Sequence, residues 1–270
     1  MSANKKPYDY ETLKCERNGH ILTITMNRPD QLNAANGTMN EEFSRIWDEV
    51  HRDSEVRVAI LTGAGRAFCA GGDVKRMANS EESSLVSRWT HSVNTNRMNI
   101  LRQLECNKPI IAKVNGAAVG LGCSLALACD VVFIANDARI GDTHVKVGLV
   151  AGDGGTALWP WLVGFHRAKE FLLGCDLMTG EEAARIGLVN HAVPKEQLDA
   201  KVQEFAQKLA DLPPLAVQWT KASTNSHLRA LVGVNMDVSL SMEHMTQASQ
   251  DHKEASLAFK EKRKPVLKGF

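Results

Sequence analysis

The sequence predicts an α/β fold whose C-terminal part is helical. In the first half of the chain, short apolar segments typical of buried strands alternate with segments of helical spacing, a pattern that favours a sheet covered by helices. After about Leu198 the strand patterns end and only helical patterns follow. We therefore expect an α/β core over residues 1–200 and a helical region over residues 201–270, which packs on the core or on another subunit.

Four segments of the core have the composition of strands. They are His20–Met26, Val56–Thr62, Pro109–Asn115 and Val131–Ala135. The first alternates apolar and polar residues, as a half-buried strand does. Two segments have helical character: Thr38–Arg52 carries apolar residues three and four apart, and Cys123–Cys129 is largely apolar. Glycine-rich turns and the turn Asn27-Arg28-Pro29-Asp30 separate several of these segments, which supports the boundaries.

The C-terminal region contains three helical patterns. They cover Leu198–Leu212, Ala216–Leu231 and Val234–Lys264, with a Pro-Pro breaker after the first. The last pattern carries apolar residues that an isolated core would leave exposed, namely Val234, Met236, Val238, Leu240, Met242, Leu257 and Phe259. Exposed apolar stripes of this kind mark contact surfaces, so the sequence predicts oligomerisation through this region.

Composition excludes several classes of protein. Apolar residues make up 44% of the 270 residues and charged residues 23%, which is enough apolar material for a core and unlike a disordered chain. Lys+Arg and Asp+Glu number 32 and 31, so no excess of positive charge points to nucleic acid or to an anionic membrane. The N-terminus has no apolar signal segment, and no run is long enough to span a bilayer. Six cysteines without CxxC spacing read as reduced thiols, so we expect a cytoplasmic protein.

Two glycine-rich turns follow predicted strands. They are Phe68–Asp73 (FCAGGD) and Asn115–Gly122 (NGAAVGLG), and the second leads into the helix at Cys123. Glycines let backbone N–H groups approach a ligand closely, and two such groups aimed at one point form an oxyanion hole. Two tight turns without a ligand are the alternative. A dinucleotide site fits less well, because no GxGxxG motif follows either strand.

These turns belong to a larger set of short motifs that runs over nearly the whole chain. The first motifs are Asn27–Pro29, Leu32–Ala34, Leu61–Gly63, Phe68–Asp73 and Lys108–Ala112. The later ones are Val114–Gly116, Gly120–Ala126, Cys129–Asp130, Gly148–Val150, Gly154–Gly155, Thr179–Gly180, Glu182–Ala183, Gly187–Val189, Phe259 and Glu261–Pro265. In this order the motifs resemble those of the enoyl-CoA hydratase/isomerase, or crotonase, superfamily.

The resemblance implies a crotonase-like spiral of ββα units, a homotrimer or a dimer of trimers, and an acyl-CoA thioester as substrate. Coenzyme A is then part of the substrate, and no separate cofactor or metal is expected. An oxyanion hole would use the N–H groups of Ala70 and Leu121, the second of which replaces the glycine usual in the family. The expected substrate and coenzyme A contacts are Cys69, Gly71, Gly72, Asp73, Lys75, Gly122 and Ser124, with Lys75 near a phosphate.

The chain departs from the hydratases at both of their catalytic glutamates, where it has Ser124 and His144. Asp153 follows nine residues after His144, in a glycine-flanked turn. A histidine accepts or donates a proton near neutral pH, and a neighbouring aspartate orients it or acts itself. A similar His/Asp pair before a Trp-Pro dipeptide occurs in the superfamily's diketone-cleaving branch, although a further histidine of that branch is missing here. We therefore expect His144 and Asp153 to be catalytic. If His144 is the general base, Asp153 holds its ring; otherwise the base is Asp153 or Asp142.

Other interpretations of the same residues stay open. Ser124 is either a nucleophile backed by His144 and Asp153 or a small pocket residue that anchors water. Asp142 either reaches the pocket or caps a loop. Metal binding at Asp142 and His144 has little support, because no third ligand at suitable spacing is evident.

Two further features lie in or next to the glycine-rich turns. Cys69 and Cys123 are candidates for reactive thiols, but buried thiols with a packing role are more common. Residues 76–92 form the most polar stretch of the core and are a candidate lid.

Three functions are compatible with these observations. The leading one is an enoyl-CoA hydratase/isomerase-type enzyme, which hydrates a 2-enoyl-CoA or performs a related water-dependent reaction. The second is a hydrolase that cleaves a thioester, or a C–C bond of a β-dicarbonyl compound, with water activated by His144 and Asp153. The third is a protein that binds acyl-CoA without catalysis, which loss of both glutamates would explain.

Overall fold

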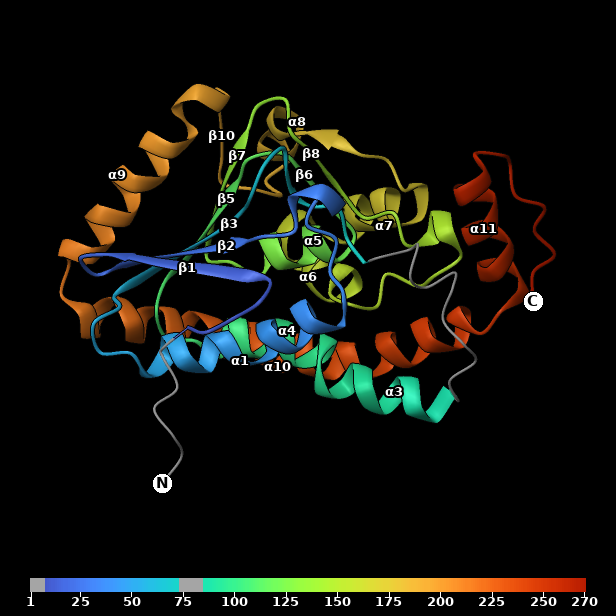
Figure 1. Cartoon of the computed structure of the whole chain (residues 1–270), viewed down its shortest axis with the longest axis horizontal. Coiled ribbons are helices and arrows are strands. Elements are labelled where there is room, and N and C mark those ends of the chain that lie inside the picture. The colour runs from blue at the N-terminus through green and yellow to red at the C-terminus, as the bar shows by residue number, and fades with distance from the viewer. Residues whose placement is uncertain (1–7, 73–84) are drawn as a thin grey trace.

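The computed structural model describes residues 8–72 and 85–270, which form two sheets surrounded by helices (Figure 1). The larger, six-stranded sheet has the order β1-β2-β3-β5-β7-β10. Its strands are β1 (Leu13–Asn18), β2 (Ile21–Met26), β3 (Val58–Gly63), β5 (Ile110–Val114), β7 (Val131–Ala135) and β10 (His191–Val193). The smaller, four-stranded sheet has the order β4-β6-β8-β9. Its strands are β4 (Ala67–Cys69), β6 (Ala117–Val119), β8 (Arg139–Gly141) and β9 (Met178–Thr179).

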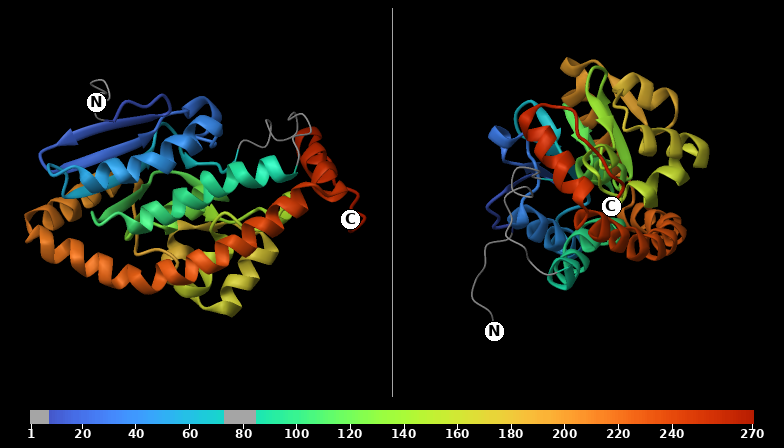
Figure 2. Two further views of the ribbon diagram at one scale, coloured as in Figure 1. Left: turned by 90° about the horizontal axis from the view of Figure 1, so that it is seen from below. Right: turned by 90° about the vertical axis from the view of Figure 1, so that its right-hand side faces the viewer.

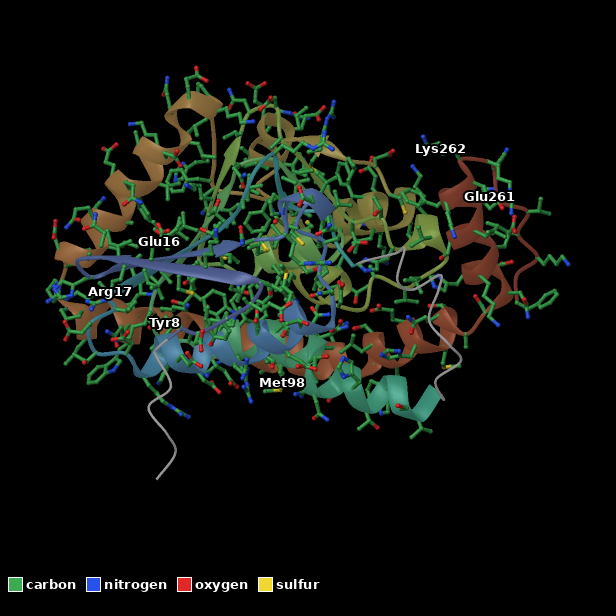
Figure 3. All side chains as sticks on the ribbon, in the orientation of Figure 1. Tyr8, Glu16, Arg17, Met98, Glu261 and Lys262 are labelled. Atoms are coloured by element: carbon green, nitrogen blue, oxygen red, sulfur yellow. The ribbon has the colours of Figure 1, made fainter. Side chains whose placement is uncertain are left out.

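The larger sheet is parallel from β2 to β10, and only the β1–β2 hairpin is antiparallel. Parallel strands need crossover connections, which are usually helical, and this explains the alternation of patterns in the sequence. Every residue of β3 is buried, as expected for a strand inside such a sheet. At the edge, Glu16 and Arg17 of β1 are exposed and lie at the periphery of the molecule (Figure 3). Charged side chains on an edge strand oppose pairing with other chains.

The helices lie around both sheets. They are α1 (Gly37–Arg52), α3 (Leu85–Asn94), α4 (Asn96–Glu105), α5 (Leu121–Leu127), α6 (Gly155–Val163), α7 (Phe165–Gly174), α8 (Gly180–Arg185), α9 (Leu198–Asp211), α10 (Pro214–Gln247) and α11 (Gln250–Glu261), with short 3-10 turns η1 (Pro29–Gln31), η2 (Val145–Val147) and η3 (Lys195–Gln197). Helix α9 packs on β3, β5 and β7, whereas α10 packs on α3, α4 and α6. Figure 2 shows α10 running along most of the length of the molecule.

The predicted α/β fold is confirmed, and the predicted core strands and helices are present with small differences at their ends. The predicted break between Leu231 and Val234 is wrong, because α10 continues through Gly233 as one helix of 34 residues. A glycine inside a helix costs only about 1 kcal/mol, which packing of α10 on its neighbours outweighs. Helix α10 ends at Gln247, inside the predicted segment Val234–Lys264. Ser249 then caps the start of α11, where its side chain accepts a hydrogen bond from the His252 N–H.

One apolar core joins the sheets to the C-terminal helices. The predicted division at residue 200 falls inside α9, and buried residues of α9 and α10, such as Val202 and Met236, belong to the same cluster as the strands. A buried ion pair adds to this packing. The Lys221 Nζ of α10 lies 2.7 Å from an oxygen of Asp130 and donates to the carbonyl of Lys108 at 2.8 Å. Breaking such a pair costs about 3–5 kcal/mol, so α10 is held firmly.

All six cysteines are free thiols. Among the helices of residues 8–72 and 85–270, none has the length and apolar character needed to cross a membrane.

Candidate active site

A cavity of about 310 Å³ lies at the carboxyl ends of the parallel strands β4, β6 and β8. The residues that follow these strands form one wall, and helices α10 and α11 contribute to another. The lining consists of Ala35, Asn40, Ala70, Gly71, Gly72, Asn96, Val119, Gly120, Leu121, Thr143, His144, Lys146, Val147, Leu149, Asp153, Leu177, Glu243 and Phe259. Carboxyl ends of parallel strands are a common place for ligands in α/β proteins.

The pairing of β6 with β8 brings the second glycine-rich turn next to His144. Val119 pairs with Gly141, and the Gly120 N–H donates to the Gly141 carbonyl at 3.0 Å. Gly120 has a φ of +55°, and a Cβ there would lie 3.3 Å from the Cε1 atom of His144. Glycine therefore lets the chain turn into α5 directly against the imidazole ring. Leu121 begins α5, so its N–H lacks the intrahelical acceptor that later residues have.

In the first glycine-rich turn, the N–H of Ala70 differs from its predicted role. The Ala70 N–H donates to the Leu32 carbonyl at 3.0 Å, so the prediction that it points at a ligand carbonyl is wrong for this structure. The Gly71 carbonyl in turn accepts from the Ala35 N–H at 2.8 Å. No acceptor for the N–H groups of Gly71 and Gly72 is found within the part of the chain that the structure describes. Both glycines line the cavity.

Three side chains form a row beside the cavity, which we call the Asp–His–Asp row (Asp142, His144, Asp153). The His144 Nδ1 atom lies 2.7 Å from Asp142 Oδ1, and the His144 Nε2 atom lies 3.2 Å from Asp153 Oδ2. Asp142 also accepts the His144 backbone N–H at 3.0 Å. Both aspartates are buried, and the Ser124 hydroxyl donates to the other oxygen of Asp153 at 3.2 Å.

The two aspartates favour the charged form of His144. Burial alone would lower the pKa of His144, but the charges of Asp153 and Asp142, and the hydrogen bonds to both, raise it well above the usual 6.5. Burial would raise the pKa of Asp142, but the His144 charge and hydrogen bonds lower it below its ordinary value. The row thus favours an imidazolium, with one aspartate on each side of the ring.

This arrangement changes the predicted roles. An imidazolium has no lone pair to accept a proton, so the raised pKa of His144 argues against a neutral His144 as the general base. Of the two interpretations of Asp142, the structure supports contact with the site, because its carboxylate holds the ring of His144. Ser124 hydrogen-bonds to Asp153 and has no contact with His144 like that of a nucleophile with its base.

Glu243 of α10 is a cavity residue that the sequence analysis missed. Its Oε2 atom is buried and has no hydrogen-bond partner within the described residues. Burial and the nearby charge of Asp153 raise the pKa of its carboxyl to about 8, so Glu243 is largely neutral at pH 7. Its helical register could have indicated this position. Glu243 lies seven residues after Met236 and three after Leu240, so it falls on the same buried face of α10.

The other predicted contacts divide into two groups. Cys69, Gly122 and Ser124 are buried and do not line the cavity. Burial raises the pKa of the Cys69 thiol to about 12, which fits a packing role. Asp73 and Lys75, together with the first part of the candidate lid over residues 76–92, lie outside the described residues. Lys146 of η2, which the sequence analysis did not single out, is exposed and lines the cavity.

The same three side chains are the one group in the described residues whose atoms lie close enough to hold a metal, within 4.8 Å of one another. The structure thus provides the third residue that the sequence spacing did not reveal. Each nitrogen of His144, however, faces a different carboxylate. The two nitrogens of an imidazole ring point away from each other, so one ion cannot bind both, and the arrangement suits hydrogen bonding better than metal coordination.

Comparison with known proteins gives a consistent result. The family model described as enoyl-CoA hydratase/isomerase matches residues 16–269. A short-chain-enoyl-CoA hydratase of Clostridium acetobutylicum is 35% identical over 263 residues, covering 94% of this chain and 96% of that protein. A crotonyl-CoA hydratase of Syntrophomonas wolfei is 35% identical over 256 residues, covering 94% and 97%. The crystal structure of an enoyl-CoA hydratase/isomerase from Mycobacterium paratuberculosis superimposes with a TM-score of 0.87 at 36% identity, covering 93% of this chain and 99% of that one.

The charge of His144 can be measured directly. In the Asp142→Asn variant an amide oxygen still accepts from Nδ1, but the negative charge is gone, so we expect the pKa of His144 to fall. The ¹⁵N shifts of the ring nitrogens, followed by NMR against pH, report this, with His144→Gln identifying the signals. The wild type should have both ring nitrogens protonated at neutral pH. A neutral His144 in the wild type at pH 7 would show that the two aspartates do not set its charge.

Proposed function

The chain belongs to the enoyl-CoA hydratase/isomerase family, and we propose that it hydrates a 2-enoyl-CoA or a closely related acyl-CoA thioester. The observation that carries this proposal is the Asp–His–Asp row beside a cavity that two glycine-rich turns also line. The substrate would be a small molecule, with coenzyme A as part of it. Six free cysteines suit a reducing compartment, so we place the activity in the cytoplasm.

We propose that the thioester carbonyl lies between the N–H groups of Leu121 and Gly72. Ala70 cannot serve here, because its N–H already donates to Leu32. Addition of water to the C2=C3 bond places negative charge on the thioester oxygen, and two fixed N–H donors stabilise that charge more in the transition state than in the substrate. The aliphatic side chain of Leu121 narrows the cavity beside this oxygen, which favours small acyl groups.

Asp153 is the proposed base. It lines the cavity, and its two oxygens also accept from Ser124 and His144, so its orientation is fixed. It takes a proton from water as the water oxygen bonds to C3. The imidazolium of His144 stays charged and offsets the negative charge that builds up in the cavity. In this proposal His144 and Asp153 keep the catalytic status that the sequence predicted, with Asp153 rather than His144 as the base.

Hydrolysis is a second candidate, favoured by the same row. Water activated by Asp153 can attack the thioester carbonyl instead of C3, or attack a ketone of a β-dicarbonyl substrate. The products distinguish the reactions. Hydration adds one water and leaves the thioester intact, whereas thioester hydrolysis releases free thiol and an acid. A protein that binds acyl-CoA without turnover is the third candidate, and turnover of any ester that is lost in Asp153→Asn excludes it.

The test is incubation of the purified protein with a panel of enoyl-CoA and acyl-CoA esters, read by mass spectrometry. We expect a gain of one water on at least one enoyl-CoA. A matched pair at one position then examines the proposed hole: Leu121→Pro removes the N–H at a helix position that tolerates proline, and Leu121→Ala retains it. The proline variant should lose about 10²–10³ in kcat relative to the alanine variant. Equal rates in the two variants, or no change in any ester, would contradict the proposal.

We further propose that the chain forms a homotrimer or a dimer of trimers. Helix α10 has a second apolar stripe, at helical spacing, on its exposed side: Leu231, Val234, Val238, Met242 and Met245. Met236 and Leu240, which the sequence analysis also expected to be exposed, are buried in the core. Val234 is 75% exposed and Met245 66%, and exposed stripes of this kind normally pack against a partner.

Light scattering should therefore give three or six times the chain mass of 29.6 kDa. In the Val234→Asp variant a charge replaces an apolar contact, and we expect smaller species without loss of helix content. A monomer at micromolar concentration would show that the stripe does not hold subunits together.

A further inference from the structure

One carboxyl of the cavity lining, that of Glu243, has no part yet in the proposed reaction. Glu243 lies on α10, remote in the sequence from the Asp–His–Asp row, and lines the same cavity as Leu121, His144 and Asp153. In the proposed hydration Asp153 accepts a proton from water, but C2 must also receive a proton. Asp153 cannot donate and accept at once, so a second group is needed.

The chain is shaped to bring Glu243 to this place. A Cβ on Gly152, next to Asp153, would lie 2.6 Å from Glu243 Oε2 and 2.6 Å from the Ser239 carbonyl. Only glycine leaves room for α10 to approach this closely. The Ser239 hydroxyl donates to the Gly152 carbonyl at 2.9 Å and fixes the contact from the same helix. Glu243 is thus positioned against the turn that carries Asp153.

The surroundings favour a neutral carboxylic acid. The negative charges of Asp153 and Asp142 raise the pKa of Glu243, and the positive charge of His144 partly offsets them. The exposed Lys146 also lines the cavity. A buried Oε2 without a protein partner is costly for a carboxylate, whereas a carboxylic acid carries a proton that it can give to a bound molecule. A purely structural glutamate would instead be expected to have its oxygens hydrogen-bonded within the protein.

From this geometry we propose that Glu243 is the general acid of the reaction, a catalytic residue that protonates C2 of the acyl-CoA. This inference rests on the proposed function and assigns its second proton transfer. The water oxygen bonds to C3 while Asp153 takes the water proton, and the C2=C3 electron pair moves to the thioester oxygen. The enolate then takes the Glu243 proton at C2. The product is a 3-hydroxyacyl thioester, and solvent returns the proton from Asp153 to Glu243.

The first test compares Glu243→Gln with Asp237→Asn. Both variants remove one carboxylate charge from α10, but Asp237 is exposed and pairs with Arg97 away from the cavity. We expect kcat to fall by about 10²–10⁴ in the glutamine variant and to stay near the wild type in the control. Binding of a saturated acyl-CoA, measured by calorimetry, should be unchanged in both.

A second readout separates catalysis from structure. In D₂O the wild type should add one deuterium at C2 on a single face, because one fixed acid delivers it. The residual product of Glu243→Gln should carry deuterium on both faces, since solvent then protonates the enolate. Deuterium on only one face of C2 in the product of the variant would overturn the proposal.

A third measurement does not need activity. Since the pKa of Glu243 is raised to about 8 in the folded protein, its contribution to stability is complete below the unfolded value near 4.5 and is lost as pH rises through about 8. As pH rises between these values, the Tm of the Glu243→Gln variant should therefore increase relative to that of the wild type. A constant difference in Tm across them would show that Glu243 is not held neutral.

The outcomes distinguish this inference from the proposed function. A wild type that changes no thioester overturns the proposed function. An active wild type whose glutamine variant retains kcat within about threefold overturns the role of Glu243 alone.

Discussion

The contact between His144 and two aspartates sets the chemistry of the whole cavity. Two carboxylates around one ring keep the imidazole charged, although burial opposes that charge. In the proposed reaction the charged ring does not act as a base, and Asp153 accepts the proton instead. The same row carries one excess negative charge, and this charge together with burial keeps a proton on Glu243. The proposed base thus follows from the charged ring, whereas the proposed acid follows from burial and the two aspartate charges, which outweigh the opposing charge of His144.

The fold supplies this row with partners from distant parts of the chain. Pairing of β6 with β8 places Gly120 beside His144, and the absence of a side chain at Gly120 lets α5 begin there. On the other side, Gly152 lets α10 approach the turn that carries Asp153. Helix α10 is itself anchored to the core by the buried Lys221–Asp130 pair. Packing of the C-terminal helix is thus linked to the position of a proposed catalytic group.

Local sequence patterns predicted the fold class and most core elements, because burial of strands and of helix faces leaves a period in the sequence. They also pointed to His144 and Asp153. They could not assign the N–H of Ala70, because its use depends on where Leu32 lies in space. They missed Glu243 because its role depends on an approach between residues far apart in the chain. The raised pKa of His144 could not be predicted for the same reason: Asp142 is two residues away, but only the turn after β8 shows that it contacts the ring.

The pH dependence of kcat/KM, measured between about pH 5 and pH 9 once a substrate is known, tests the central claim most directly. If His144 is already an imidazolium, kcat/KM should not fall as pH drops through about 6.5, where an ordinary histidine gains its proton. It should fall on the alkaline side, as Glu243 loses its proton around pH 8. A loss of rate on acidification through about pH 6.5 that disappears in His144→Gln would contradict the account, because neutral His144 would then be the base.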